Sequence, residues 1–208
     1  MSLAIKIKEL GKEIGLDVIR ITNAESFPET ERQIRKNIEK GFIPDDIFQN
    51  GSANVCLNLD KIKKRCNPKS ILKRARSIIS VAQCYLIEET EDIQDKDQPL
   101  GKIAKYDVGN FYYDIKLKLK KIVDFVNQKT EFKFKFKNKS CYVSLVEKPI
   151  AQRAGIGWYG KHSIIITERF GSWVVLGEII TELELETDAP LPQSCGDCKI
   201  CMDLCPTK

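Results

Sequence analysis

Eight cysteines are the residues of this chain best suited to chemistry, and four of them stand in one short run. The run reads Cys-x-x-Cys-x-x-Cys-x-x-x-Cys-Pro and ends at Pro206. Thiolates are soft ligands that suit iron–sulfur clusters, and short turns between them let several sulfurs converge on one cubane. In such a run the first three cysteines hold one [4Fe–4S] cluster, and the fourth belongs to a second cluster. The spacing therefore predicts four metal ligands: Cys195, Cys198, Cys201 and Cys205.

A structural zinc site and a disulfide framework are the two other interpretations of these cysteines. Zinc sites usually pair two Cys-x-x-Cys units across a longer gap, which differs from this triple run with its trailing Cys-Pro. Disulfide frameworks are typical of small secreted chains, whereas this chain has 208 residues and no secretory signal. Spacing and length both favour the iron–sulfur interpretation.

The run holds too few cysteines for two complete clusters. Cys195, Cys198 and Cys201 supply three ligands of one cluster, and Cys205 begins a second site. We expect the missing ligands downstream of Lys208 or from another source. Without them the tail should be poorly held or free of metal, because cluster folding depends on full ligation. The sequence thus predicts the first half of a ferredoxin-type cassette.

A second motif, Gly-x-Gly-x-x-Gly, is formed by Gly155, Gly157 and Gly160. Glu178 follows about 20 residues later, as the dinucleotide-binding fingerprint requires. That fingerprint also needs a strand before it and a helix after it. Here a helix-like stretch precedes the glycines and a strand-like stretch follows them, so the order excludes a dinucleotide site. The glycines instead indicate a tight turn or a close approach of the backbone.

Polar side chains follow these glycines directly. Lys161, His162 and Ser163 come after the turn, and Trp158 and Tyr159 lie inside it. Donors on a glycine-rich turn suit a phosphate or an amide-rich ligand. A tight turn that only stabilises the fold is the other interpretation, and the sequence leaves both open. The single histidine, His162, belongs to a residue type that is more often exposed or hydrogen-bonded than catalytic.

The composition is that of an ordinary globular chain, with 42% hydrophobic residues, 30% charged residues and a net charge of +5. No apolar run approaches the roughly 20 residues that a membrane span needs. The first 14 residues form an amphipathic pattern and not a signal peptide, so we expect a cytoplasmic protein that does not bind a membrane. Residues 61–76 and 133–139 are densely basic, which indicates either a solvated lysine-rich surface or a polyanion such as RNA.

Hydrophobic periodicity predicts the elements that position these residues. Helical spacing is found at residues 3–14, 29–40 and 109–127, with a helix-like stretch at 149–154. Strand patterns are found at residues 16–22, 76–87, 131–137, 163–167 and 173–180. The fold class is therefore α/β or α+β, with a mixed sheet flanked by helices in residues 1–187. Residues 188–208 form a linker and the start of a ferredoxin-like module.

Three stretches resemble the epoxyqueuosine reductase family. The strongest resemblance lies in residues 147–176, EKPIAQRAGIGWYGKHSIIITERFGSWVVL, which continue through GEIITELELETDAP into the cysteine run. Residues 65–86, RCNPKSILKRARSIISVAQCYL, are similar to the family's Pro-rich turn and central strand. Residues 105–122, KYDVGNFYYDIKLKLKKI, are similar to its Tyr-x-x-Gly entry to a long helix.

The resemblance implies a cofactor and a substrate. In that family the N-terminal domain binds cobalamin and is related to the corrinoid domain of reductive dehalogenases, and two [4Fe–4S] clusters deliver electrons to cobalt. The substrate is a modified base at the wobble position of tRNA, whose epoxide is reduced to give queuosine. The implied partners are tRNA and an electron donor such as a ferredoxin or flavodoxin. The implied cobalamin-lining residues are Gly157, Trp158, Gly160, Lys161, His162 and Ser163.

The chain departs from the family pattern at two places. The family has an aspartate, the proposed proton donor, six residues before the glutamate that Glu147 matches, and here that position is Cys141. A thiol, with an ordinary pKa of about 8.5, is a poor replacement for a carboxylic acid. The family's Arg-Asp-Tyr-His at the helix entry is replaced by Asn-Phe-Tyr-Tyr at residues 110–113.

We therefore predict an iron–sulfur oxidoreductase similar to epoxyqueuosine reductase, in which low-potential electrons pass from [4Fe–4S] clusters to a bound corrinoid. The alternative is a non-catalytic iron–sulfur electron carrier or a corrinoid-reducing partner, which the loss of the acid at Cys141 favours. A tRNA-binding module without redox chemistry would rest on the basic stretches alone.

Overall fold

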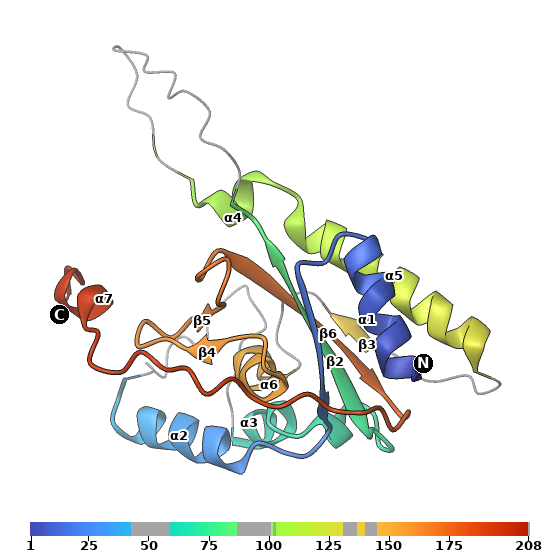
Figure 1. Cartoon of the computed structure of the whole chain (residues 1–208). Coiled ribbons are helices and arrows are strands. Elements are labelled where there is room, and N and C mark those ends of the chain that lie inside the picture. Colours follow the sequence, from blue (N-terminus) through green and yellow to red (C-terminus); the bar gives the residue numbers. More distant parts are fainter. Residues whose placement is uncertain (43–58, 87–100, 102, 131–136, 140–144, 208) are drawn as a thin grey trace.

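The computed structural model describes residues 1–42, 59–86, 101, 103–130, 137–139 and 145–207. Its centre is a four-stranded sheet in the order β1-β2-β6-β3 (Figure 1). The strands are β1 (Val18–Asn23), β2 (Ser77–Cys84), β6 (Val174–Thr181) and β3 (Lys137–Lys139). Every neighbouring pair is antiparallel, so the described sheet is not the mixed sheet that the sequence predicted. Periodicity locates strands but carries no information about their direction, which is why it could not distinguish the two.

The two central strands are buried on both faces, as their nearly continuous apolar sequences predict. Every residue of β2 except Cys84 is buried, and so is every residue of β6 except Leu176. The ladder between them aligns Ser80 with Glu178. Because directly opposite residues share a face, these two polar side chains project into the same layer of the core.

Helices α1 (Leu3–Glu13) and α5 (Phe111–Lys129) cover one face of the sheet (Figure 1). The apolar stripe of α5 is fully buried and consists of Ile115, Leu119, Ile122 and Val126. This helix lies close to β6, since a Cβ at Gly177 would stand 3.0 Å from Leu119 Cδ1.

The opposite face is covered by α6 (Glu147–Ala154), with α2 (Pro28–Glu39), α3 (Leu59–Arg65) and the 3₁₀ turn Pro68–Ser70 beside it (Figure 1). The apolar side of α6 is buried against the sheet and consists of Ile150, Ala151 and Ala154. The face of β6 that carries Glu178 belongs to this second layer, because its neighbours two residues away pack into the same clusters.

A small hairpin, β4 (Trp158–Tyr159) and β5 (Ile165–Ile166), follows α6, and α4 (Lys105–Val108) precedes α5. After β6 the chain runs back along the domain to the short helix α7 (Ile200–Asp203) (Figure 1). None of the helices that the structure describes is long and apolar enough to cross a membrane.

The predicted helices are confirmed as α1, α2, α5 and α6, and the predicted strands at 16–22, 76–87 and 173–180 as β1, β2 and β6. The strand predicted at 163–167 is confirmed only as the two-residue β5. Residues 131–136 of the predicted strand 131–137 lie outside the described residues, and β3 begins at Lys137.

Candidate functional site

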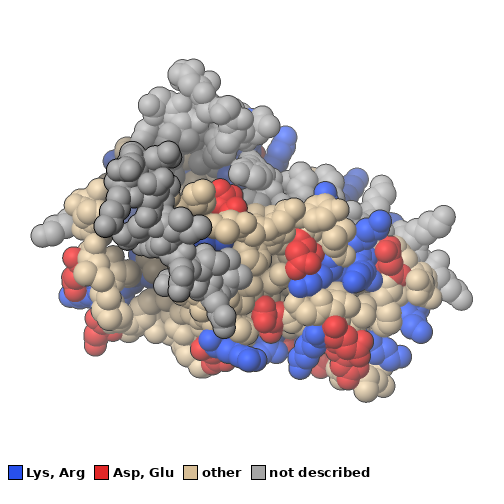
Figure 2. Space-filling view, turned by 90° about the horizontal axis from the view of Figure 1, so that it is seen from above, with Lys and Arg blue, Asp and Glu red and all other residues tan. Residues whose placement is uncertain are grey.

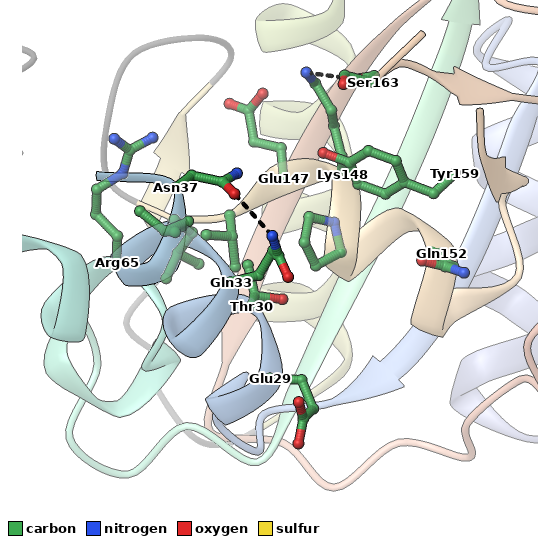
Figure 3. Close-up of a pocket in the computed structure, with 14 residues that line it drawn as sticks. Glu29, Thr30, Gln33, Asn37, Arg65, Glu147, Lys148, Gln152, Tyr159 and Ser163 are labelled. Atoms are coloured by element: carbon green, nitrogen blue, oxygen red, sulfur yellow. Dashed lines mark hydrogen bonds between the residues drawn. The ribbon is translucent and has the colours of Figure 1, made fainter. Parts of the chain in front are cut away.

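A cavity of about 800 Å³ opens between α2 and the N-terminal end of α6 (Figure 3). The hairpin β4–β5 and Arg65 of α3 complete its wall. The lining residues are Glu29, Thr30, Gln33, Ile34, Asn37, Arg65, Leu145, Val146, Glu147, Lys148, Pro149, Gln152, Tyr159 and Ser163.

Helix α2 contributes polar side chains to this cavity at successive turns. The helix begins at Pro28, a residue suited to the first helical turn because its fixed φ is already helical. Glu29, Gln33 and Asn37 are spaced four residues apart and so lie on one face. Gln33 Nε2 donates to Asn37 Oδ1 at 2.8 Å. The wall therefore presents neutral amides where a bound amide or phosphate could exchange hydrogen bonds.

Helix α6 contributes charged and amide side chains from its polar face. Glu147 and Lys148 stand in its first turn, and Gln152 stands one turn further on. Lys148 Nζ donates to the Ser163 carbonyl at 2.7 Å and so joins the helix to the hairpin. The helix ends at Gly155, whose φ of 80° is the left-handed conformation that glycine adopts without strain.

Two glutamates at and behind the cavity wall, Glu147 and Glu178, have raised pKa values. Burial raises the pKa of Glu147, and the nearby cations Arg65 and Lys148 oppose that shift. Behind it, burial and then repulsion by Glu147 raise the pKa of Glu178 well above its ordinary value of 4.5. Glu178 is only 5% exposed. Both effects favour the neutral acid, so the cavity wall holds a carboxyl group that is shifted toward its protonated form.

Sequence reasoning considered Glu178 only as part of the rejected dinucleotide fingerprint and did not place it near a site. A signal was available, because a single acid stands inside an otherwise apolar strand. The cavity residues of α2 and Arg65 were also missed, since an amphipathic helix normally exposes such side chains to water.

The glycine turn is explained in part by packing within the hairpin. A Cβ at Gly157 would stand 2.2 Å from the Ile166 carbonyl oxygen, so only glycine allows β4 to approach β5 this closely. A Cβ at Gly160 would stand 2.5 Å from the His162 ring. Of the predicted cobalamin-lining residues, Ser163 lines the cavity, whereas Gly157, Trp158, Gly160, Lys161 and His162 do not line it.

The other predicted residues of this turn have separate contacts. His162 is exposed, and its Nδ1 accepts from the Ile164 backbone N–H at 3.2 Å. Trp158 Nε1 is buried without a hydrogen-bond partner among the described residues. Lys161 reaches away from the cavity to the cysteine segment, where its Nζ donates to the carbonyls of Gly196 and Cys198 at 2.7 and 2.8 Å.

The cysteine run forms a turn followed by the short helix α7. The Cys198 backbone N–H donates to the Cys195 carbonyl at 2.9 Å, and the Cys205 N–H donates to the Met202 carbonyl at 3.2 Å. All four cysteines of the run are free thiols, so the disulfide interpretation has no support here. Within the part of the chain that the structure describes, no three His, Cys, Asp or Glu side chains gather closely enough to hold a metal.

The two departures from the family pattern can be followed only in part. Cys141 lies outside the described residues. At the helix entry, Asn110 immediately precedes α5, and the Phe111 ring packs 6.0 Å from the Tyr85 ring. Tyr85 also contacts Trp173, with ring centroids 5.7 Å apart. Aromatic side chains thus pack together at the entry to α5.

Three cations of the first basic stretch form ion pairs with acids. Lys69, Arg74 and Arg76 pair with glutamates at 2.9, 2.9 and 2.5 Å. Their partners are Glu25, Glu182 and Glu184. Figure 2 shows the same mixture of Lys and Arg with Asp and Glu on one face of the molecule. This arrangement favours the solvated-surface interpretation over a polyanion site, and the second stretch lies mostly outside the described residues.

Comparison with known proteins shows which family this chain resembles. A family model described as "Epoxyqueuosine reductase QueG, DUF1730" matches residues 65–140. Epoxyqueuosine reductase from Escherichia coli strain K12 is 30% identical over 207 residues, which cover 99% of this chain and 52% of that protein. The structure of epoxyqueuosine reductase from Streptococcus thermophilus superposes with a TM-score of 0.83 at 33% identity, covering all of this chain and 53% of that one. The chain is therefore similar along its whole length to epoxyqueuosine reductases.

Two further structures extend this comparison. An epoxyqueuosine reductase solved with an epoxyqueuosine-modified tRNA stem loop matches with a TM-score of 0.76 at 28% identity, over 99% of this chain and 52% of that one. A catabolic reductive dehalogenase matches with a TM-score of 0.54 at 14% identity, over 94% of this chain and 22% of that one. The dehalogenase shares the fold alone. The chain spans about half the length of the epoxyqueuosine reductases that it matches.

Proposed function

We propose that this chain is the corrinoid-binding and cluster-proximal part of an epoxyqueuosine reductase. In this proposal, electrons pass from [4Fe–4S] clusters to a bound cobalamin and reduce a modified base in tRNA. One observation carries it: the similarity to epoxyqueuosine reductases in sequence and in fold runs the length of this chain, through the cavity and the cysteine run.

The donor set of the cavity fits a corrinoid. Corrinoids carry amide side chains and a phosphate, and the cavity offers the amides of Gln33, Asn37 and Gln152 beside the cations Arg65 and Lys148. The orphaned Trp158 Nε1 adds a buried donor in the adjoining hairpin. When bound, a corrinoid supplies the reduced cobalt that donates electrons to substrate. In the proposal, the chain's own side chains hold the amides and neutralise the phosphate, and the wall adds Glu147, a carboxyl whose pKa burial raises.

The chemistry of the C-terminal donor set fits an iron–sulfur cluster. Four free thiols at this spacing are the ligands that such clusters use. Their convergence on iron remains part of the proposal, because the thiols are not gathered in the structure. When bound, clusters of this type carry electrons at low potential.

Transfer RNA is the proposed substrate carrier. The support is the relative that was solved with a modified tRNA stem loop. The basic stretch 61–76 adds little support of its own, because three of its cations are paired with glutamates.

Cobalamin binding and metal content test this function directly. The chain is reconstituted anaerobically with iron and sulfide, with a small thiol present to complete coordination, and is titrated with cob(II)alamin while absorbance is followed. We expect saturable cobalamin binding, with an affinity that falls at least tenfold in the double variant Arg65→Ala/Gln152→Ala. We also expect the parent protein to bind iron and sulfide in equal amounts, and Cys198→Ala to lose both. Zinc in place of iron, or no corrinoid binding by the folded protein, would contradict the proposal.

A non-catalytic electron carrier or corrinoid-reducing partner is the second candidate, and the thiol at Cys141 favours it. Both candidates predict a cluster, whereas a simple electron carrier would bind no corrinoid. They differ in single-turnover reduction of an epoxyqueuosine-modified anticodon stem loop, which only the enzyme performs.

A further inference from the structure

We propose that Lys161 is a positioning residue that fixes the cysteine segment against the β4–β5 turn and places a positive charge beside the first cluster-ligand turn. This inference deepens the proposed function and depends on it only for the identity of the metal. The docking of the segment stands on contacts within this chain.

The geometry of Lys161 carries the argument. Its Nζ donates to the Gly196 carbonyl at 2.7 Å and to the Cys198 carbonyl at 2.8 Å. An ammonium group has three donors, so one side chain can bridge both carbonyls of this turn. Gly196 has a φ of 47°, which turns the backbone between the first two cysteines of the run. The lysine therefore contacts the loop that the first two cysteines define.

The rest of the linker is already docked on the same domain. Asp188 accepts from Lys8 Nζ at 2.6 Å and from the Ile21 N–H at 2.8 Å. Gln193 Nε2 donates to Glu168 Oε1 at 2.9 Å. Gly155 has room for the Ala189 carbonyl only because it lacks a Cβ, which would stand 2.3 Å from that oxygen. Lys161 continues this series into the cysteine run itself, where it contacts the carbonyls of Gly196 and Cys198.

The turn that carries Lys161 belongs to the β4–β5 hairpin, which also lines the cavity. Ser163 lies two residues further on and joins the cavity wall through Lys148. A single hairpin thus contacts the proposed corrinoid site on one side and the proposed cluster ligands on the other. Electron transfer between two centres depends on the distance between them. Because this hairpin contacts both proposed sites, it can hold that distance constant.

A positive charge at this place has a measurable electrical consequence. The reduced form of a cluster carries one more negative charge than the oxidised form, so a nearby cation stabilises it and raises the reduction potential. Loss of Lys161 should therefore shift the potential to a more negative value. A purely mechanical contact would not produce that shift once the cluster is bound.

The test compares Lys161→Met, Lys161→Arg and the matched control Lys118→Met. Lys118 also donates to a backbone carbonyl, that of Gly15 at 2.9 Å, and its loss changes the net charge equally. In the metal-free chain we expect Lys161→Met to speed amide hydrogen exchange in residues 194–198 about tenfold, equivalent to about 1.4 kcal/mol. Lys161→Arg should remain near the parent protein, and Lys118→Met should leave this segment unchanged.

The second arm uses the chain reconstituted with iron and sulfide, with a small thiol present to complete coordination. A redox titration followed by electron paramagnetic resonance should show a more negative potential in Lys161→Met than in Lys118→Met. Unchanged exchange in Lys161→Met would overturn the positioning role, and an unchanged potential would overturn the placement of its charge beside the cluster. If no cluster forms in any variant, the cluster part of the proposed function fails, and the exchange result alone decides the docking.

Discussion

Ser80 on β2 and Glu178 on β6 stand directly opposite each other in the central ladder, and each ends in a buried oxygen without a hydrogen-bond partner among the described residues. An unsatisfied buried polar group costs free energy, and a buried carboxylate costs more than a buried acid. Glu147, at the start of α6, adds repulsion to that site. The centre of the sheet therefore carries a destabilising acid next to the candidate cavity.

Glu178→Gln is expected to stabilise the protein at high pH. Because the pKa of Glu178 is raised on folding, the folded state binds more protons than the unfolded state above pH 4.5. The free energy of unfolding of the parent protein should therefore fall, relative to the variant, as the pH rises above that value. We expect a gain of about 1–3 kcal/mol at pH 8 that shrinks toward pH 4.5, measured by urea unfolding. Glu186→Gln, at an exposed position, is the control and should follow the parent curve.

Gly155→Ala should be more harmful than Gly41→Ala. Both glycines have a positive φ, of 80° and 69°, so both substitutions incur the strain of a left-handed alanine, about 1 kcal/mol. Only at Gly155 would the new Cβ also meet the Ala189 carbonyl oxygen, whereas nothing lies within 4 Å at Gly41. We expect Gly155→Ala to lose about 2–3 kcal/mol by thermal or urea unfolding. Equal losses in the two variants would show that the linker does not pack on α6.

Asp188→Ala should release the beginning of the linker. Its carboxylate accepts from the Ile21 N–H and from Lys8, and its side chain is 17% exposed. Removing an acceptor of this kind costs about 1–3 kcal/mol. Limited proteolysis should then cut between residues 186 and 195 faster than in the parent protein. Glu186→Ala, two residues earlier and exposed, should change stability by less than about 0.5 kcal/mol.

Local sequence patterns predicted the elements but not the relations between them. The apolar spacing of Ile115, Leu119 and Ile122 locates α5, and the β-branched run of β2 locates a central strand, because both signals lie within one element. The contact between Asp188 and Ile21 joins residues 167 positions apart, and no periodicity encodes it. The order of elements around the glycine motif was enough to exclude a dinucleotide site, and the structure confirms a helix before it and a strand after it.

The candidate site was predicted less completely for the same reason. The glycine turn was recognised from its residue types, but its glycines serve the approach of β4 to β5, and Lys161 turns away from the cavity. The cavity depends on α2 and α6, which lie more than 100 residues apart in the sequence, so it became visible only when the chain was folded. Cysteine spacing remains the strongest local signal, because the ligands of such a cluster lie within one short segment.

The last prediction concerns Cys141, which lies outside the described residues and stands where the resemblance in sequence leads us to expect the family's acid. Opening an epoxide places negative charge on oxygen, and loss of a hydroxyl then follows, so both steps benefit from a positioned proton donor. General acid catalysis of this kind contributes roughly 10²–10⁴-fold. A thiol is a weaker acid and a weaker hydrogen-bond donor than a carboxylic acid.

We therefore expect the parent protein, loaded with cobalamin and clusters, to reduce an epoxyqueuosine-modified stem loop slowly, and Cys141→Asp to do so about 10²-fold faster or more. Cys141→Ser is the control, because serine is isosteric with cysteine but is not a useful acid at neutral pH. Glu147 is the other acid that could supply the proton, since burial shifts its pKa upward at the cavity wall. If Glu147 has that role, the parent protein is already fast, Glu147→Gln abolishes turnover, and the aspartate at position 141 adds little. A single-turnover assay on these four proteins distinguishes the two outcomes.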